Sequence, residues 1–137
     1  MTVTDGAATV VGIEADADVV RVRQVARSYA SRAGLSLVDQ TKLITAASEL
    51  ARNTLIYGGG GEATIEIAAD GNRTGVRIAF VDEGPGIANI DLAMQDGWTS
   101  GTGLGLGLSG SRRLVDRFDL ESKEGEGTRV QITKWGR

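Results

Sequence analysis

The sequence predicts an α+β fold, a two-layer sandwich in which a mixed but mostly antiparallel sheet carries helices on one face. Two long segments repeat apolar residues at helical spacing, and most of the segments that alternate between apolar and polar residues follow them. The chain has 137 residues, of which 41% are apolar and 24% charged. This length and composition suit a single globular domain over residues 1–137.

The two long helical segments lie in the first half of the chain. The first is expected to start at Asp16 or Asp18, either of which could cap it, and to stop at Gly34. The second is expected to run from about Leu37 to Tyr57, with an apolar face wide enough to lie on a sheet. Four consecutive glycines, 58–61, then end it.

The strands are predicted from alternating residues and from turn residues between them. Two shorter helices are expected near residues 90–95 and 107–117. The expected strands are residues 8–13, the hairpin 62–69 and 76–81, and the closing pair 118–123 and 128–135. The expected core consists of Val22, Tyr29, Leu43, Leu50, Ile65, Ile67, Ile78, Phe80, Leu114, Phe118 and Ile132.

Composition removes several classes of function. The chain has no cysteine and no histidine, which excludes disulfides, thiolate metal sites, imidazole bases and a phosphohistidine intermediate. Its net charge of −3 argues against general nucleic-acid binding. No segment approaches the roughly 20 apolar residues of a membrane span, and the N-terminus lacks signal-peptide features. A cytoplasmic protein without membrane contact is expected.

Glu49 and Asn53 are the first candidate functional pair. They lie four residues apart on the second helix and therefore share one face. A carboxylate can orient or deprotonate an attacking hydroxyl, and an amide oxygen one turn later can ligate Mg²⁺. Taken alone, the pair is explained better by a solvated polar helix face.

The second candidate is the run Asp82-Glu83-Gly84-Pro85-Gly86-Ile87, which follows a predicted strand. A tight turn alone would account for these residue types. Two glycines beside a proline also allow a ligand to approach the backbone closely. The carboxylate at the strand end could then accept a hydrogen bond from an exocyclic amine such as that of adenine.

The third candidate is a glycine-rich loop before the helix near 107–117. Its four glycines in seven positions cost much backbone entropy for a purely structural loop, so ligand binding is favoured over a hinge. Backbone N–H groups that lead into a helix N-terminus form a phosphate cradle. The pattern matches neither a P-loop nor a Rossmann motif. The loop residues are Gly101, Thr102, Gly103, Leu104, Gly105, Leu106, Gly107 and Leu108.

These features, followed by Gly127-Thr128 at the start of the last strand, occur in one order: Glu-x-x-x-Asn, Asp-x-Gly-x-Gly, a Gly-Leu loop, and Gly-Thr. The order resembles the ATP-binding (Bergerat, or GHKL) domain shared by gyrase, the Hsp90 chaperone, histidine kinases and MutL. Within that superfamily, the chain is most similar to the small serine/threonine kinases of bacterial partner-switching systems, of the RsbT type found in the stressosome, with anti-sigma-factor kinases as near neighbours. The matching runs are Val38-Asp39-Gln40, Ser48-Glu49-Leu50-Ala51-Arg52-Asn53, Asp82–Ile87, Gly103-Leu104-Gly105 and Lys134-Trp135.

The resemblance implies a role for each matching position. Glu49 would be the catalytic base or orienting carboxylate, and Asn53 would ligate Mg²⁺. Asp82 would bind the adenine amine, with Gly84, Gly86 and Ile87 shaping that pocket and Thr128 reaching adenine through water. The glycine loop would cover the phosphates. Two registers remain open for that loop, with residues 103–108 favoured over 101–106.

The resemblance also implies the partners. ATP with Mg²⁺ would serve to phosphorylate a serine of a STAS-domain antagonist, and the released kinase would bind and activate a PP2C-type phosphatase. The absence of histidine separates the chain from sensor histidine kinases, which need a phosphoacceptor histidine. Two alternatives stay open: a non-catalytic, nucleotide-gated module or anti-sigma-factor kinase that sequesters a sigma factor, and an ATP-hydrolysing fragment of a larger machine.

Overall fold

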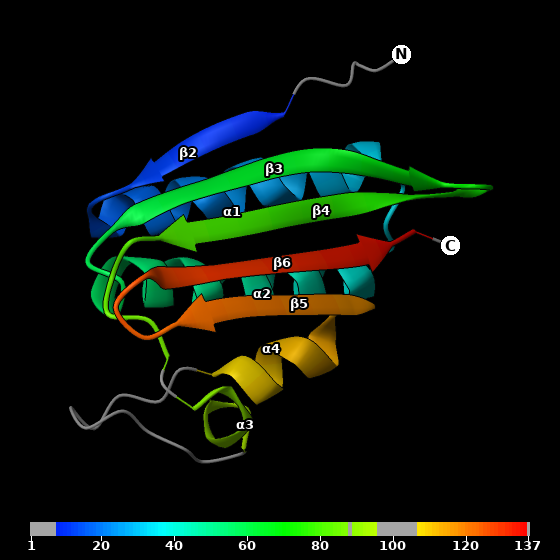
Figure 1. Ribbon diagram of the computed structural model, residues 1–137. Coiled ribbons are helices and arrows are strands. Elements are labelled where there is room, and N and C mark those ends of the chain that lie inside the picture. Colours follow the sequence, from blue (N-terminus) through cyan, green and yellow to red (C-terminus); the bar gives the residue numbers. More distant parts are fainter. Residues whose placement is uncertain (1–7, 88, 96–106, 137) are drawn as a thin grey trace.

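The computed structural model describes residues 8–87, 89–95 and 107–136. A five-stranded sheet has the order β2-β3-β4-β6-β5, and all of its pairings are antiparallel. Figure 1 shows β2 and β5 at the two edges of this sheet. Its strands are β2 (Thr9–Ile13), β3 (Gly61–Asp70), β4 (Arg73–Asp82), β5 (Arg117–Lys123) and β6 (Gly127–Trp135).

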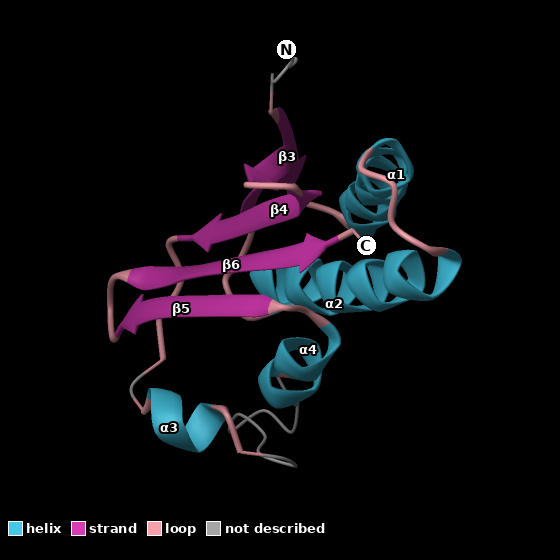
Figure 2. Ribbon diagram, turned by 90° about the vertical axis from the view of Figure 1, so that its right-hand side faces the viewer, coloured by secondary structure: helices cyan, strands magenta, loops and turns pink. Residues whose placement is uncertain are grey.

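The two long helices, α1 and α2, lie on one face of the sheet, as predicted, and α3 lies beyond the edge strand β5 (Figure 2). Within the described part of the chain, no helix combines the length and the apolar character that crossing a bilayer requires. The two-layer α+β fold is confirmed, but the described sheet is antiparallel throughout and not mixed as predicted. Its helices are α1 (Asp16–Arg32), α2 (Leu37–Ile56), α3 (Ile90–Ala93) and α4 (Leu108–Leu114).

Side chains near the ends of α1 and α2 explain where these helices begin and end. The carboxylate of Asp18 accepts hydrogen bonds from the backbone N–H groups of Glu14 and Ala15, at 2.9 and 3.1 Å. The N-cap residue of α1 is Ala15, so the prediction that Asp16 or Asp18 occupies that position is wrong; Asp18 is the third residue of the helix and reaches back to the backbone before it. Gly34 follows the last turn of α1 with φ +80°, a left-handed conformation that glycine adopts without strain. The hydroxyl of Ser36 caps α2 by accepting a hydrogen bond from the N–H of Asp39 at 3.1 Å.

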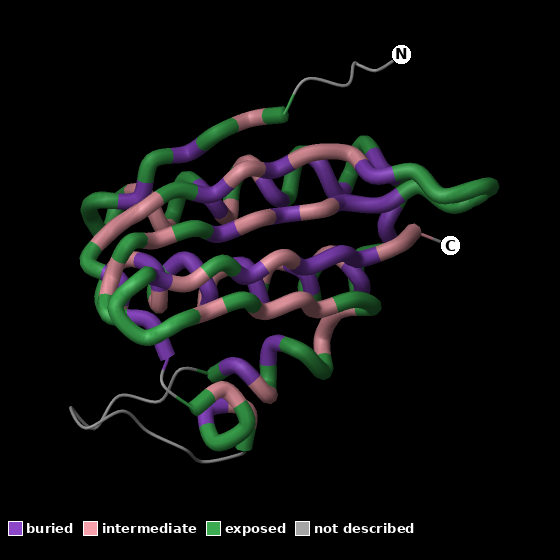
Figure 3. Tube along the Cα trace, viewed as in Figure 1, coloured by how far each residue is buried: buried purple, intermediate pink, exposed green. Residues whose placement is uncertain are grey.

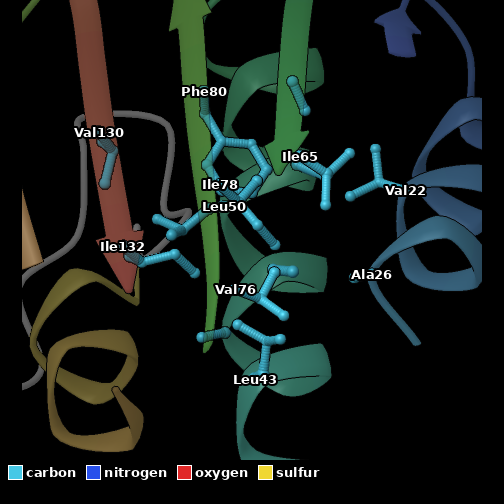
Figure 4. Close-up of a cluster of buried hydrophobic side chains, with 14 of the residues drawn as sticks. Val22, Ala26, Leu43, Leu50, Ile65, Val76, Ile78, Phe80, Val130 and Ile132 are labelled. Carbon is cyan, nitrogen blue, oxygen red and sulfur yellow. The ribbon is translucent and has the colours of Figure 1, made fainter. Parts of the chain in front are cut away.

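The core fills the space between the sheet and the two long helices. Burial alternates along the strands, because successive side chains point to opposite faces (Figure 3). Val76, Ile78 and Phe80 of β4 project toward α2, where Leu43 and Leu50 meet them (Figure 4). These five side chains are at most 2% exposed, and burying each one stabilises the fold by about 1.5–3 kcal/mol.

Three of the predicted core residues are only partly buried. Phe118 lies on the edge strand β5, and Leu114 is the last residue of α4. Ile67 lies in β3 toward its hairpin with β4. All three are at the margin of the layer between sheet and helices, where one side of a residue has no neighbouring element to cover it.

The fourth helix is shorter than the predicted 107–117, and Asp116 accounts for its early end. Val115 already has extended backbone, and the backbone N–H of Asp116 donates to the carbonyl of Thr133 at 3.0 Å. The Asp116 carboxylate accepts a hydrogen bond from the N–H of Trp135 at 2.7 Å. The backbone N–H of Asp116, which a longer helix would need for its own hydrogen bond, is thus bonded to β6 instead.

A buried ion-pair network joins this end of the sheet to the start of α2. The ammonium nitrogen of Lys134 lies 3.6 Å from a carboxylate oxygen of Asp39 and 3.6 Å from one of Asp116. The side chains of Lys134 and Asp39 are only 5% and 8% exposed. Because buried charges need partners, this network holds the N-terminal turn of α2 against β6.

Candidate nucleotide-binding site

Three polar residues form one row across neighbouring strands. Asp82 of β4 is paired with Thr128 of β6, which is in turn paired with Ser122 of β5. Paired residues of antiparallel strands share a face of the sheet, and this row continues the inward positions of Phe80 and Val130. The row therefore faces the layer of helices. It lies at the end of the sheet opposite the β3–β4 turn.

Two residues of this row, Asp82 and Thr128, border a small cavity between the sheet and α2. The cavity has a volume of about 20 Å³, so a purine ring would require its walls to move. One wall is Leu108, the first residue of α4 and the last residue of the predicted glycine loop. The lining residues are Leu50, Asn53, Thr54, Tyr57, Phe80, Asp82, Ile87, Leu108, Thr128 and Val130.

Asp82 presents a hydrogen-bond acceptor at this cavity. Its carboxylate accepts the backbone N–H of Gly84 at 2.9 Å. Burial raises the pKa of Asp82, while hydrogen bonds from the backbone of Gly84 and Thr128 oppose part of that rise. The carboxylate is half-buried, so a ligand N–H donor at this position would replace water that burial has removed.

Glycines let the chain come close around Asp82. A β-carbon on Gly58 would overlap the Asp82 side chain, and one on Gly84 would lie 2.7 Å from the backbone of Gly58. Gly86 has φ +74°, and the hydroxyl of Tyr57 donates to its carbonyl at 3.1 Å. Gly84 and Gly86 thus shape the turn after β4 without lining the cavity.

The hydroxyl of Ser122 connects three segments of the site. It accepts the backbone N–H of Ile87 at 2.7 Å and donates to the carbonyl of Gly127 at 3.0 Å. It also lies 2.8 Å from the hydroxyl oxygen of Thr128. Sequence reasoning missed Ser122 and Tyr57. The register of the closing hairpin was the only signal in the sequence that could have placed Ser122 opposite Thr128.

Glu49 lies one helical turn before Asn53 and borders a different space. Asn53 lines the cavity, whereas Glu49 lines a groove of about 510 Å³ between α1 and α2. The carboxylate of Glu49 also packs against Gly107, at the N-terminus of α4. The groove is lined by Val20, Arg23, Gln24, Arg27, Ile44, Thr45, Ser48 and Glu49.

The structure brings most of the predicted residues to one end of the fold. Asn53, Asp82, Ile87, Leu108 and Thr128 share the cavity. Gly107, at the start of α4, lies beside the side chain of Glu49. The remaining loop residues, Gly101, Thr102, Gly103, Leu104, Gly105 and Leu106, lie outside the described residues.

The donor set fits ATP with Mg²⁺. Asp82 offers an acceptor for a base amine, and the side chain of Asn53 offers oxygen to a metal ion. Among the described residues, no group of three or more acidic, histidine or cysteine side chains gathers to hold a metal alone. Such a site suits Mg²⁺ that is shared with substrate phosphates and waters, and does not suit a metal held by the protein alone.

Comparisons with known proteins identify the family. The profile of the "Histidine kinase-, DNA gyrase B-, and HSP90-like ATPase" family matches residues 38–135. Serine/threonine-protein kinase RsbT of Bacillus subtilis (strain 168) is 47% identical over 118 residues, which cover 86% of this chain and 89% of that protein. An anti-sigma F factor of Clostridium beijerinckii is 36% identical over 95 residues, which cover 66% of each chain.

A solved structure shares the fold. The crystal structure of the RsbU and RsbW domains of a Mycobacterium tuberculosis protein superposes with a TM-score of 0.64 at 19% identity, covering 96% of this chain and 33% of that one. At this identity the likeness concerns the fold alone. From the family profile and the RsbT relative together, the chain belongs to the histidine kinase-, gyrase B- and HSP90-like ATPases and, among them, to the RsbT-like serine/threonine-protein kinases.

Proposed function

We propose that this protein transfers the γ-phosphoryl group of ATP to a serine of a STAS-domain antagonist in a bacterial partner-switching system. Once released from its phosphorylated substrate, it binds and activates a PP2C-type phosphatase. The observation that carries the proposal is the position of Glu49. Its side chain borders an open groove between α1 and α2, while Asn53, one turn later, lines the nucleotide cavity.

Residues one turn apart on α2 thus face the two reactants: Glu49 faces the groove for the protein substrate, and Asn53 faces the cavity for ATP. The groove between α1 and α2 is open and can admit a segment of another protein beside Glu49. Bound ATP with Mg²⁺ would supply the transferable phosphoryl group, and Asn53 would hold the metal. The oxygen of the incoming serine forms a bond to the γ-phosphorus while the bond to the bridging oxygen breaks. The serine proton passes to the carboxylate of Glu49.

Glu49→Gln tests the catalytic role. The substitution preserves size and removes the base, so phosphotransfer should fall roughly a hundredfold or more while ATP affinity stays within about twofold. Glu62→Gln, an exposed glutamate on β3, is the matched control and should leave both quantities unchanged. Transfer of label from [γ-³²P]ATP to the purified STAS partner measures the rate. A Glu49→Gln rate equal to that of the control would refute the assignment.

A second candidate function is a nucleotide-gated binding module that sequesters a sigma factor. It is favoured by the similarity to proteins named anti-sigma F factor. The two functions separate when the acceptor serine of the STAS partner is replaced by alanine and ATP is titrated against binding. Under the kinase proposal, wild-type partner is released after phosphorylation and the alanine variant is retained. A binding module would treat the two partners alike.

A further inference from the structure

Ser122 lies beside this site, against Thr128, and the nucleotide-binding motifs assign it no role. We propose that Ser122 determines base specificity: its hydroxyl makes Thr128 a pure hydrogen-bond acceptor, so that the pocket selects purines with a 6-amino group over purines with a 6-oxo group. This inference rests on the proposed use of a nucleotide at the cavity beside Asp82. Ser122 acts through Thr128 and is a positioning residue.

The Ser122 oxygen takes part in three hydrogen bonds. A serine hydroxyl has one proton to donate and two lone pairs to accept with. The N–H of Ile87 occupies one lone pair at 2.7 Å. The single proton is directed to the carbonyl of Gly127, which can only accept, at 3.0 Å. In that arrangement Ser122 meets Thr128 through its remaining lone pair.

Either hydroxyl can donate across the 2.8 Å contact between the two oxygens. While the Ser122 proton is on the Gly127 carbonyl, which can only accept, Thr128 is the donor to Ser122. The Thr128 oxygen keeps its lone pairs and has no proton left for a ligand. Since Thr128 also lines the cavity, its contribution there is that of an acceptor.

Asp82, the neighbour of Thr128 in the row, is also a hydrogen-bond acceptor. The ionised carboxylate of Asp82 only accepts hydrogen bonds, and Asp82 is paired with Thr128 across β4 and β6. Two adjacent acceptors suit a ligand group that carries N–H donors, such as the 6-amino group of adenine or a water that it orients. The 6-oxo group of hypoxanthine is itself an acceptor and would face two acceptors without a proton between them. A buried polar site left unpaired in this way discriminates strongly.

Two hydrogen bonds hold the Ser122 hydroxyl in this orientation. The side chain of Ser122 is held simultaneously by the turn after β4, through Ile87, and by the start of β6, through Gly127. Rotation of the hydroxyl away from Gly127 would leave that carbonyl without this donor and turn the Ser122 proton toward Thr128. Thr128 stays an acceptor only while Ser122 is in place.

The test compares Mg·ATP with Mg·ITP, whose bases differ at the 6-position and the adjoining N1 proton. Dissociation constants are measured by calorimetry for the wild type, Ser122→Ala and Ser122→Thr in the full chain. Ser122→Ala frees the Thr128 proton for an oxo group, so the preference for ATP over ITP should fall roughly threefold to tenfold, the value of one hydrogen bond. Ser122→Thr keeps the hydroxyl on a strand and should keep the wild-type preference.

Thr128→Val supplies a second variant that keeps the shape of the strand residue and removes the hydroxyl. Its preference for ATP should also fall, and adding Ser122→Ala to it should change the ratio no further. An ATP-to-ITP ratio that is unchanged or raised in Ser122→Ala would overturn the inference about Ser122. A wild-type protein that binds neither nucleotide would instead overturn the proposed function.

Discussion

Gly107→Ala should slow phosphotransfer by displacing the carboxylate of Glu49. A β-carbon at residue 107 would lie 2.7 Å from Cγ of Glu49 and 2.8 Å from its Cδ and Oε2. Ordinary carbon contacts are about 3.5–4.0 Å, so the side chain must retreat by about 0.8 Å or more. Misplacing a catalytic group by about 1 Å can cost roughly a hundredfold in rate, so we expect a loss of about tenfold to a hundredfold.

The same substitution also strains the backbone, and a control variant separates the two effects. Gly107 has φ +64°, where an alanine costs about 1–2 kcal/mol. Gly125 has φ +82° and no atom within 4 Å of the position of a β-carbon, so Gly125→Ala carries similar strain without touching Glu49. Both variants should lose similar stability in urea unfolding, and only Gly107→Ala should lose phosphotransfer.

The assay is single-turnover transfer of the γ-phosphoryl group to the STAS partner at saturating ATP, with ATP affinity measured separately. Saturation removes any contribution from weaker nucleotide binding, which matters because Gly107 adjoins the predicted phosphate loop. A transfer rate for Gly107→Ala within twofold of that for Gly125→Ala would refute the reasoning. It would mean that the carboxylate finds an equally productive position despite the added methyl group.

Two further predictions concern ionisable groups. Burial raises the pKa of Asp82, so the folded protein without nucleotide keeps this proton to a higher pH than the unfolded chain. Its contribution to stability is therefore present at low pH and is lost as pH rises from about 3.9 to the raised folded pKa. Asp82→Asn should remove this pH dependence from the free energy of unfolding measured in urea. Identical pH profiles for Asp82→Asn and the wild type would contradict the prediction. Lys134→Met should destabilise the fold by about 3–5 kcal/mol, because Asp39 and Asp116 lose their shared cation. Adding Asp39→Asn should recover part of this loss in urea unfolding, and strictly additive losses would show that the pair is not coupled.

Local sequence signals were sufficient to predict most elements of the fold. The spacing of apolar residues in α1 and α2 and the glycines that follow these helices act within one or two helical turns, so they can be read from neighbouring residues. The end of α4 could not be predicted in this way. Asp116 leaves the helix because β6, nearly twenty residues later, offers better partners for its backbone and carboxylate.

The candidate site likewise combines residues that local patterns predict with residues that depend on long-range contacts. Asp82 and Gly84 lie in one short run whose composition indicates a close backbone approach, and Glu49 and Asn53 share a helix face. The positions of Tyr57 and Ser122 depend on tertiary contacts with Gly86 and Thr128, which no local pattern encodes. Likewise, Lys134 and Asp39 are far apart in sequence and meet only when β6 lies against α2.

The row of Asp82, Thr128 and Ser122 also constrains where the chain can change length. Side chains along a strand alternate between faces, so adding or deleting one residue in the β5–β6 turn would rotate Ser122 out of the layer beside the helices. This turn is also anchored, since the N–H of Gly125 donates to the carbonyl of Pro85 at 2.7 Å. The exposed β3–β4 turn at Gly71 lies at the opposite end of the sheet (Figure 3). Insertions and deletions among natural relatives should therefore concentrate at the β3–β4 turn and spare the β5–β6 turn.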